Sequence, residues 1–351
     1  MATERLSLAL AVADLPPEGR ILVLRPMAGS DLAALPQARC LLVQGFRPDH
    51  DALTRSGWSV VAETAETGFA AAVVLAPRSR AEARALVAEA AARVQPGGPI
   101  WLDGAKTDGI DSLLKDVRGR AELSAPFAKA HGKVAMLSNP GPAVFADWAA
   151  GATHPAPGFV ALPGCFSATG IDAGSAALAS VLPMDLKGKA ADLGAGWGWL
   201  SAEILKRPKV TALHLVEAEW AALQSARTNV ADPRAEFHWA DLRAGVKLPP
   251  LDLVVMNPPF HVGRAGDPSL GAAFIRAAAG LLVPSGQLYM VANRHLPYEE
   301  VLAQVFGEVE ELKGPGTAGA GGFKLFRAAR PLRRPADSGR GIQRSPKRRG
   351  R

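Results

Sequence analysis

The stretch VVMNPPFHVG, from Val254 to Gly263, is an apolar run interrupted by an asparagine and two prolines. The prolines lack an N–H and hold φ at about −65°, and the first of them restricts Asn257 to extended geometry. The spacing therefore predicts a rigid corner with two hydrogen-bond acceptors, the amide oxygen of Asn257 and the carbonyl oxygen of Pro258. Such a corner can hold both hydrogens of an amino group on a flat ring, so that the nitrogen lone pair turns toward an electrophilic carbon.

This chemistry needs no strong base, because the amine loses its proton only as it becomes positively charged. Phe260 adds a flat face against which a base removed from its stack can lie. For an isolated Asn-Pro-Pro sequence, the simpler interpretation is a turn that ends a strand. A second motif at the same edge of the fold is needed to favour catalysis over that turn.

The second motif, KAADLGAGWGWLSAEIL, places Asp192, Gly194, Gly196 and Gly198 between a predicted strand and a predicted helix. Glycines allow a tight turn and a close approach of the backbone to a ligand beside the helix N-terminus. A dinucleotide fingerprint would require a glycine where Trp199 stands. The pattern is more typical of a loop that binds S-adenosylmethionine (SAM), in which Asp192 meets the ammonium of the methionine portion directly or through water.

Two further acids follow the next two predicted strands. Glu217 ends TALHLVEAE, where its carboxylate can accept hydrogen bonds from both ribose hydroxyls, and Asp241 ends the following strand, where it can accept from an adenine amino group. Each acid alone is more often a helix cap or a solvated strand end. Because ligands of open α/β sheets bind at the carboxyl ends of the strands, the three acids together predict a nucleoside cofactor.

The elements that position these residues come from an alternation of short β-rich runs and Ala-rich helical stretches, which predicts parallel sheets with helices on both faces. Residues 71–106 can be aligned with residues 251–294, and Ala76-Pro77 then stands where Asn257-Pro258 stands in the second half. We therefore expect a duplicated domain whose first copy has lost its cofactor site. Shared α/β architecture without duplication is the alternative.

With both motifs identified, the second half resembles the class I SAM-dependent methyltransferases that carry an Asn-Pro-Pro-aromatic motif. More narrowly, it resembles the bacterial ribosomal RNA small subunit methyltransferase C family, which methylates N2 of a guanine in 16S rRNA. The residues that carry the resemblance lie in order between Gly164 and Ala328: GCFSATGIDAGSAALAS, DLGAGWGWLS, NPPFHVG, GQLYMVANRHLPYEEVL and GGFKLFRA.

The resemblance implies two tandem Rossmann-like methyltransferase domains, a degenerate one at residues 1–150 and a catalytic one at residues 151–330. It implies target-base contacts at Asn257, Pro258 and Phe260. It implies SAM contacts at Asp192, Gly194, Gly196, Glu217 and Asp241. Trp197 and Trp199 are bulkier than the residues expected in that loop, and the Arg-rich end of the chain is not a family feature.

The formal charge of +7 comes from 40 Lys and Arg against 33 Asp and Glu. Residues 327–351 contain ten of these basic residues and one acidic residue, so the rest of the chain carries 30 basic and 32 acidic residues. Residues 331–351 are therefore predicted to form a disordered basic tail that binds RNA by generic electrostatics. Only Cys40 and Cys165 occur, without metal-ligand spacing, so we expect no metal site. No apolar stretch approaches the ~18 residues of a membrane helix, which predicts a cytoplasmic protein.

The sequence thus predicts a SAM-dependent methyltransferase that acts on the N2 amine of a guanine in ribosomal RNA, and we expect this RNA to be the 16S rRNA of the small subunit. Three alternatives remain open: a 23S rRNA guanine-N2 methyltransferase, a protein glutamine N5-methyltransferase, and a non-catalytic RNA-binding assembly factor. The sequence decides neither the nucleotide that is modified nor the oligomeric state. Its predicted partner is ribosomal RNA, free or within the small ribosomal subunit.

Overall fold

The computed structural model describes residues 4–11, 15–149, 151–259, 261–262, 265–266, 268–314 and 322–332. Phe260 and residues 333–351 of the predicted tail lie outside the described residues. Among the described residues, no helix is both long enough and apolar enough to cross a bilayer.

The first half of the chain forms a seven-stranded sheet with the strand order β3-β2-β1-β4-β5-β7-β6. Strands β1 to β5 run parallel, β7 is antiparallel to β5, and β6 is antiparallel to β7. The strands are β1 (Ile21–Leu24), β2 (Cys40–Val43), β3 (Val60–Val61), β4 (Ala71–Leu75), β5 (Pro99–Ala105), β6 (Phe127–Lys129) and β7 (Gly132–Ser138). The helices are α1 (Arg5–Leu10), α2 (Arg47–Arg55), α3 (Arg80–Arg93) and α4 (Ile110–Arg118), with 3₁₀ turns η1 (Gln37–Arg39), η2 (Lys106–Asp108) and η3 (Pro142–Trp148).

The second half forms another seven-stranded sheet, in the order β10-β9-β8-β11-β14-β16-β15. Its strands are β8 (Lys187–Leu193), β9 (Lys209–Glu217), β10 (Ala235–Trp239), β11 (Leu251–Met256), β14 (Leu282–Asn293), β15 (Phe306–Leu312) and β16 (Phe323–Pro331). Its helices are α5 (Ala173–Val181), α6 (Trp199–Leu205), α7 (Trp220–Asn229), α8 (Pro268–Leu281) and α9 (Tyr298–Val305). A separate two-stranded ribbon, β12 (His261–Val262) and β13 (Ala265–Gly266), follows the Asn-Pro-Pro motif.

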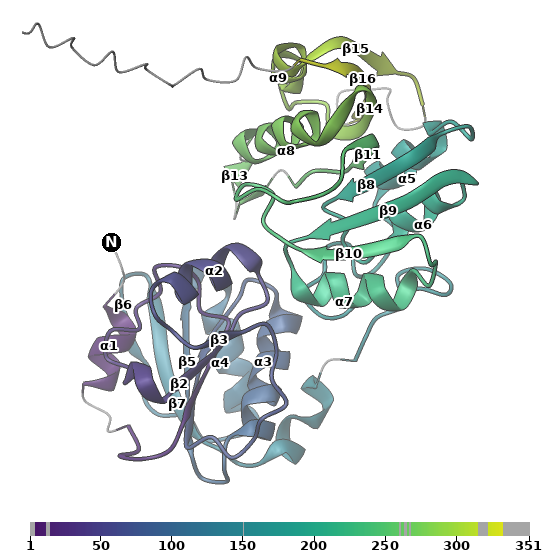
Figure 1. Cartoon of the computed structure of the whole chain (residues 1–351). Helices are drawn as coiled ribbons and strands as arrows, with labels where there is room; N and C mark the ends of the chain where they lie inside the picture. The colour runs from purple at the N-terminus through teal and green to yellow at the C-terminus, as the bar shows by residue number, and fades with distance from the viewer. Residues whose placement is uncertain are drawn as a thin grey trace, which may run out of the picture.

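The two sheets have the same topology. If β1 is matched to β8, every later strand of the first sheet has a counterpart in the same place of the second, including the two antiparallel strands at one end. Figure 1 shows the two halves as separate layered bodies that meet near α2 and α7. The predicted fold class, two tandem Rossmann-like α/β domains, is confirmed. The exact domain boundaries stay predictions.

Strand β11 illustrates why these residues form a central strand. Its sequence, LDLVVM, is buried at every position except Asp252, because helices cover both faces of a parallel sheet. Side chains of α5, α6 and α7 pack in one apolar cluster, and those of α8 and α9 pack in the cluster on the other face. The strand and its neighbour β8 therefore provide a rigid base for the loops that leave their carboxyl ends.

Candidate active site

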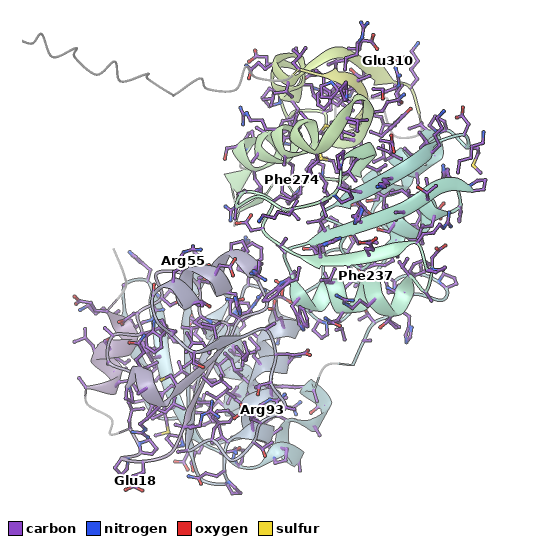
Figure 2. The ribbon with its side chains drawn as sticks, in the orientation of Figure 1. Glu18, Arg55, Arg93, Phe237, Phe274 and Glu310 are labelled. Carbon is purple, nitrogen blue, oxygen red and sulfur yellow. The ribbon has the colours of Figure 1, made fainter. Side chains whose placement is uncertain are left out.

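The two predicted motifs lie beside each other in the structure. Strands β8 and β11 are paired in parallel, with Val255 opposite Asp192, so the loops that follow them leave the same edge of the sheet. A Cβ atom placed on Gly194 would lie 4.0 Å from the carbonyl oxygen of Asn257 and 3.4 Å from the ring of Phe274. Phe274 belongs to α8 and is labelled in Figure 2. The glycine loop and the asparagine corner thus share one site.

A pocket opens between these loops. Its wall includes residues 194–197 of the glycine loop, Trp199 and Leu200 at the start of α6, and Asn257. The wall also includes Phe166, Ser167, Asp172 and Ser175, which come from the part of the chain that precedes β8.

The side chain of Asn257 has a defined orientation. Its amide nitrogen donates hydrogen bonds to the Asp172 carboxylate, at 2.7 Å, and to the Ser175 hydroxyl, at 2.9 Å. An ionised carboxylate can only accept hydrogen bonds, so the NH2 group of the amide must face Asp172. The amide oxygen of Asn257 is consequently the acceptor atom on the side away from Asp172.

Asp172 also forms the N-cap of α5. The same oxygen of its carboxylate accepts the backbone N–H of Ser175 at 2.8 Å, which satisfies one of the free donors at the helix start. The sequence analysis assigned no role to Asp172 or Ser175. An Asp three residues before a Ser at a helix start is a recognisable cap, but its contact with Asn257 has no local signature in the sequence.

The glycine loop needs its glycines for two reasons. Gly194, Gly196 and Gly198 have φ values of 79°, 55° and 88°. Residues with a Cβ atom rarely adopt this left-handed backbone conformation. A Cβ atom on Gly198 would also lie 2.9 Å from the side chain of Val230. The bulky Trp197 is accommodated because its indole packs in a small buried cluster and donates to the carbonyl oxygen of Phe166 at 3.1 Å.

Asp192 is buried beneath the loop and does not belong to the pocket wall. One carboxylate oxygen accepts from the Ser201 hydroxyl at 2.6 Å, and the other has no hydrogen-bond partner among the described residues. Burial raises the pKa of Asp192 to about 7. Burying a carboxylate oxygen without a hydrogen-bond donor costs free energy. A cationic ligand or a bridging water would supply the missing donor.

Glu217 is held rigidly at the end of β9. Its carboxylate accepts three backbone N–H groups, those of Ala218 at 2.7 Å, Glu219 at 2.8 Å and Gly196 at 2.9 Å. Burial raises the pKa of Glu217, while the three backbone donors act in the opposite direction. The carboxylate therefore lies next to the glycine loop, although it is not part of the pocket wall that contains Asn257.

The remaining predicted site residues differ in their surroundings. Asp241 accepts the backbone N–H of Arg243 at 2.9 Å and forms an ion pair with the guanidinium of the same residue at 3.1 Å, which is a local turn contact. Pro258 is buried directly after Asn257. Phe260 cannot be placed, because it lies outside the described residues. The structure thus groups Asn257 with Gly194 and Gly196 and leaves Asp241 in a separate turn.

The first half carries different residues at the equivalent positions. Arg25 follows β1 as Gly194 follows β8, and its N–H donates to Val43 as the N–H of Gly194 donates to Val216. Arg25 keeps the left-handed backbone, with a φ of 61°. Its guanidinium donates to the side chain of Gln44 at 2.8 Å. The first half therefore presents an arginine side chain where the second half presents a bare glycine backbone.

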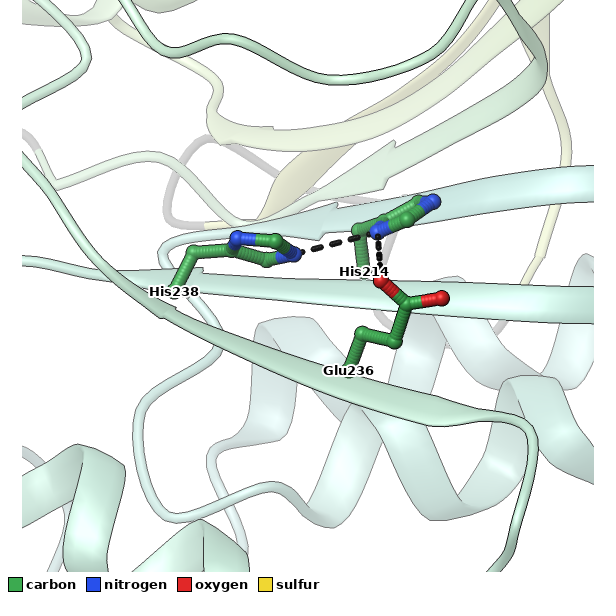
Figure 3. A group of neighbouring side chains, drawn as sticks. All are labelled: His214, Glu236 and His238. Carbon is green, nitrogen blue, oxygen red and sulfur yellow. Dashed lines mark hydrogen bonds and ion pairs between the residues drawn. The ribbon is translucent and has the colours of Figure 1, made fainter.

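A second cluster of titratable groups lies on strands β9 and β10 (Figure 3). Nδ1 of His214 is 3.0 Å from Nε2 of His238 and 3.4 Å from a carboxylate oxygen of Glu236. These are side chains of the kinds that bind zinc, and their ligand atoms lie within 4.8 Å of one another. Burial lowers the pKa of both histidines. The cluster does not contribute to the wall of the pocket with Asn257.

Known protein families and individual proteins resemble this chain in sequence. The family model named Methyltransferase small domain matches residues 157–326. Ribosomal RNA small subunit methyltransferase C of Erwinia tasmaniensis is 35% identical over 175 residues, which is 48% of this chain and 48% of that protein. The protein of the same name from Psychromonas ingrahamii is 30% identical over 261 residues, which is 70% of this chain and 73% of that protein. The chain thus spans about half the length of the first relative and nearly three quarters of the second.

The fold has a counterpart among solved structures. The T. thermophilus 16S rRNA N2 G1207 methyltransferase (RsmC), in complex with AdoMet and guanosine, matches with a TM-score of 0.73 and 24% sequence identity, over 90% of this chain and 89% of that chain. This match shows that both halves together have the fold of that protein. From the extent of the Psychromonas match, the chain belongs to the ribosomal RNA small subunit methyltransferase C family.

Proposed function

We propose that the protein is a SAM-dependent methyltransferase that modifies the N2 amine of a guanine in 16S rRNA, with ribosomal RNA or the small ribosomal subunit as its partner. The observation that carries the proposal is the orientation of Asn257, whose amide nitrogen is held by Asp172 and Ser175 beside the glycine loop. A substrate of this kind implies a cytoplasmic location. The names and ligands of the relatives support the same assignment.

The residues around the pocket are suited to SAM. The glycine backbone would lie along the methionine portion, Glu217 would accept from the ribose hydroxyls, and the Asp192 oxygen without a partner among the described residues would accept from the ammonium directly or through water. Asp241 accepts from the adenine amino group with a lone pair that Arg243 leaves available. When bound, SAM supplies the electrophilic methyl group.

The catalytic contribution of the protein is to position the amine. The amide oxygen of Asn257 and the carbonyl oxygen of Pro258 each accept one hydrogen of the guanine N2 group, and the ring of Phe260 supports the base. With both hydrogens held, the nitrogen lone pair would face the methyl group that bound SAM supplies. The nitrogen, positively charged once it carries the methyl group, would release its proton to water, so positioning supplies most of the rate acceleration.

The two halves of the molecule have different tasks in this proposal. Residues 151–330 form the catalytic domain, and residues 331–351 add basic charge for RNA. Residues 1–150 form a degenerate copy without a cofactor site, because the side chain of Arg25 stands where a cofactor would approach the backbone and Gln44 stands where Glu217 stands in the second half.

The test is methyl transfer with purified protein and labelled SAM, using small subunits and 16S rRNA from cells that lack this enzyme. Label in guanine N2, released by nuclease and not by protease, is expected. Label that is released only by protease would instead indicate a glutamine N5-methyltransferase. Absence of label in every substrate would contradict the proposal.

Asn257→Ala separates catalysis from binding. Because a key hydrogen-bond acceptor for the reacting group is lost, kcat should fall about a hundredfold or more. RNA binding, followed by a filter or anisotropy assay, should remain within about twofold of the parent, since electrostatic contacts to phosphates provide most of it. Unchanged methyl transfer would exclude Asn257 from the reaction.

A further inference from the structure

The first half contacts the second half through a short antiparallel pairing of backbone segments. Phe46 forms a β-bridge with Glu219, the N–H of Arg47 donates to the carbonyl of Ala218 at 2.8 Å, and the N–H of Trp220 donates to the carbonyl of Gly45 at 2.8 Å. Figure 1 shows the region, where α2 faces the start of α7. Residues 45–47 thus hold residues 218–220 in one register.

Arg25 adds an ionic contact to this pairing. Its guanidinium lies 2.8 Å from one carboxylate oxygen of Glu219 in the second half and 2.9 Å from Glu82 in the first half. All three side chains are largely shielded from solvent, with exposed fractions of 22%, 20% and 15% for Arg25, Glu219 and Glu82. A charged hydrogen bond in such surroundings is stronger than one at the surface.

Trp239 extends the contact to the next strand. Its indole N–H donates to the carbonyl of Ala218 at 2.9 Å and is 3.1 Å from the carbonyl of Gly45. The guanidinium of Arg47 stacks over the indole at 4.7 Å from the ring centre. Trp239 is the last residue of β10 and lies two residues before Asp241, and Glu217 is the last residue of β9. The first half therefore contacts the chain at the ends of both strands.

The first half contacts residues 218–220, and this segment includes the two residues whose backbone N–H groups orient Glu217. The N–H groups of Ala218 and Glu219 both donate to the same carboxylate oxygen of Glu217. The carbonyl of Ala218 and the side chain of Glu219 are in turn fixed by Arg47, Trp239 and Arg25. A shift of this segment would therefore move the two donors that hold the carboxylate.

We propose that Arg25 is a positioning residue for the cofactor, by which the first half clamps residues 217–220 so that the Glu217 carboxylate is preorganised for the two ribose hydroxyls. The inference rests on the proposed function, in which Glu217 binds the ribose. It also gives the first half a task in the reaction, because the arginine that stands at its former cofactor loop now stabilises the loop of its partner domain. Preorganisation of this kind lowers the cost of ordering the site when the ligand binds.

The test compares the affinity of full-length variants for S-adenosylhomocysteine by calorimetry, without RNA. Arg25→Ala is expected to weaken binding about tenfold, within the usual range for coupling between neighbouring sites. Alanine faces the same backbone strain as arginine at a φ of 61°, so the change removes only the side chain. At saturating SAM, kcat should stay within about twofold of the parent, since Asn257 is untouched.

Three comparisons separate positioning from general loss of stability. Arg25→Lys, which keeps a charge beside Glu219, should recover part of the affinity. Arg25→Ala combined with Glu219→Gln should be no weaker than the more affected single variant, because both changes remove one interaction. Arg80→Ala is the matched control, since it breaks an exposed ion pair with Asp116 inside the first half and should leave affinity unchanged.

Hydrogen exchange provides a readout that does not depend on affinity. The amides of Ala218 and Glu219 should exchange faster in Arg25→Ala than in the parent, while amides of β8 should not. Binding by Arg25→Ala within twofold of the parent, or equal weakening by Arg80→Ala, would overturn the inference. If the parent itself bound no S-adenosylhomocysteine, the proposed function would fail instead, so the two failures are distinguishable.

Discussion

At the scale of residues, the central feature is that Asn257 is oriented by acceptors that the chain supplies from a distant helix. The amide nitrogen faces Asp172 and Ser175, and the oxygen faces the other way. A free asparagine side chain could present either end of its amide to a substrate. Because a carboxylate accepts hydrogen bonds, the amide oxygen is the end left for a ligand, and in the proposed reaction this oxygen accepts from the target amine.

Substitutions at Asp172 test this selection. Ser and Asn both cap helices well, so Asp172→Ser and Asp172→Asn should both preserve α5. In Asp172→Asn the backbone N–H of Ser175 should keep the amide oxygen where the carboxylate oxygen now accepts from both Ser175 and Asn257. The shorter Ser side chain cannot reach both groups, so we expect kcat to fall about tenfold or more in Asp172→Ser and to stay near the parent value in Asp172→Asn. Steady-state methyl transfer checks the order, with melting temperature as the control; equal rates would show that the contact does not affect catalysis.

Asp192 predicts how cofactor affinity depends on pH. Burial raises the pKa of Asp192 to about 7, so in the free protein the neutral acid predominates below that pH. A cationic ammonium favours the ionised form, and binding below pH 7 must therefore release a proton. Affinity for S-adenosylhomocysteine should rise from pH 6 to about pH 7 and then level off, whereas Asp192→Asn should show a nearly flat profile by calorimetry. A parent profile as flat as that of the variant would place Asp192 outside the cofactor site.

At the scale of elements, strands β9 and β10 at the edge of the second sheet carry two histidines, His214 and His238. Burial of both side chains disfavours their protonation. His214 lies opposite Glu236 in the ladder, and His238 lies two residues farther along β10 on the same face. The pKa values of both histidines are lowered, chiefly by burial and for His238 also by His214. The folded state therefore favours the neutral form of both imidazoles.

The sign of the effect on stability follows from linkage. Below the unfolded pKa of about 6.5, the unfolded chain binds protons that the folded chain does not, so these histidines lower the free energy of unfolding as the pH falls. His238→Gln keeps a polar partner for His214 and removes one such group. Urea unfolding at pH 7.5 and 5.5 should show a smaller loss of stability on acidification in the variant than in the parent. An equal or larger loss in the variant would contradict the assignment.

At the scale of the whole molecule, one sheet topology occurs twice, with different residues at equivalent turns. Both sheets have the same strand order, yet the turn after β8 is open glycine backbone and the turn after β1 carries Arg25. The guanidinium of Arg25 in the first half contacts Glu219 in the second half, so the first half contacts the segment that orients Glu217. The two halves are thereby linked at the edge where ligands of such sheets bind.

The basic end of the chain is predicted to act only on RNA affinity. Residues 333–351 contain eight basic residues and one acidic residue. Deleting them should weaken RNA binding and reduce the slope of log affinity against log salt concentration, because fewer counterions are released from the phosphates. Affinity for S-adenosylhomocysteine should not change. A salt slope equal to that of the parent would show that this segment does not contact RNA.

Much of the site could be predicted from the sequence because it depends on local rules. Proline limits φ at its own position and the geometry of the residue before it, and glycine permits the left-handed turns found at Gly194, Gly196 and Gly198. The alternation of strands and helices was sufficient to predict the α/β fold class. It was also sufficient to predict that the loops carrying both motifs lie at the same edge of the sheet. The sequence by itself therefore determined the type of fold, the two loops that meet at the candidate site and the place of Glu217 at the end of its strand.

Only the tertiary structure decided which distant groups meet. Asp172 lies 85 residues before Asn257, and Arg25 lies 194 residues before Glu219, and neither separation leaves a periodic or spacing signal. The environment of Asp192 is equally non-local, since its strand lies between β9 and β11 and its carboxylate contacts Ser201 of α6. These contacts depend on the order in which strands assemble into a sheet and on how two sheets dock, and hydrogen bonds formed that way are specified by the packed chain as a whole.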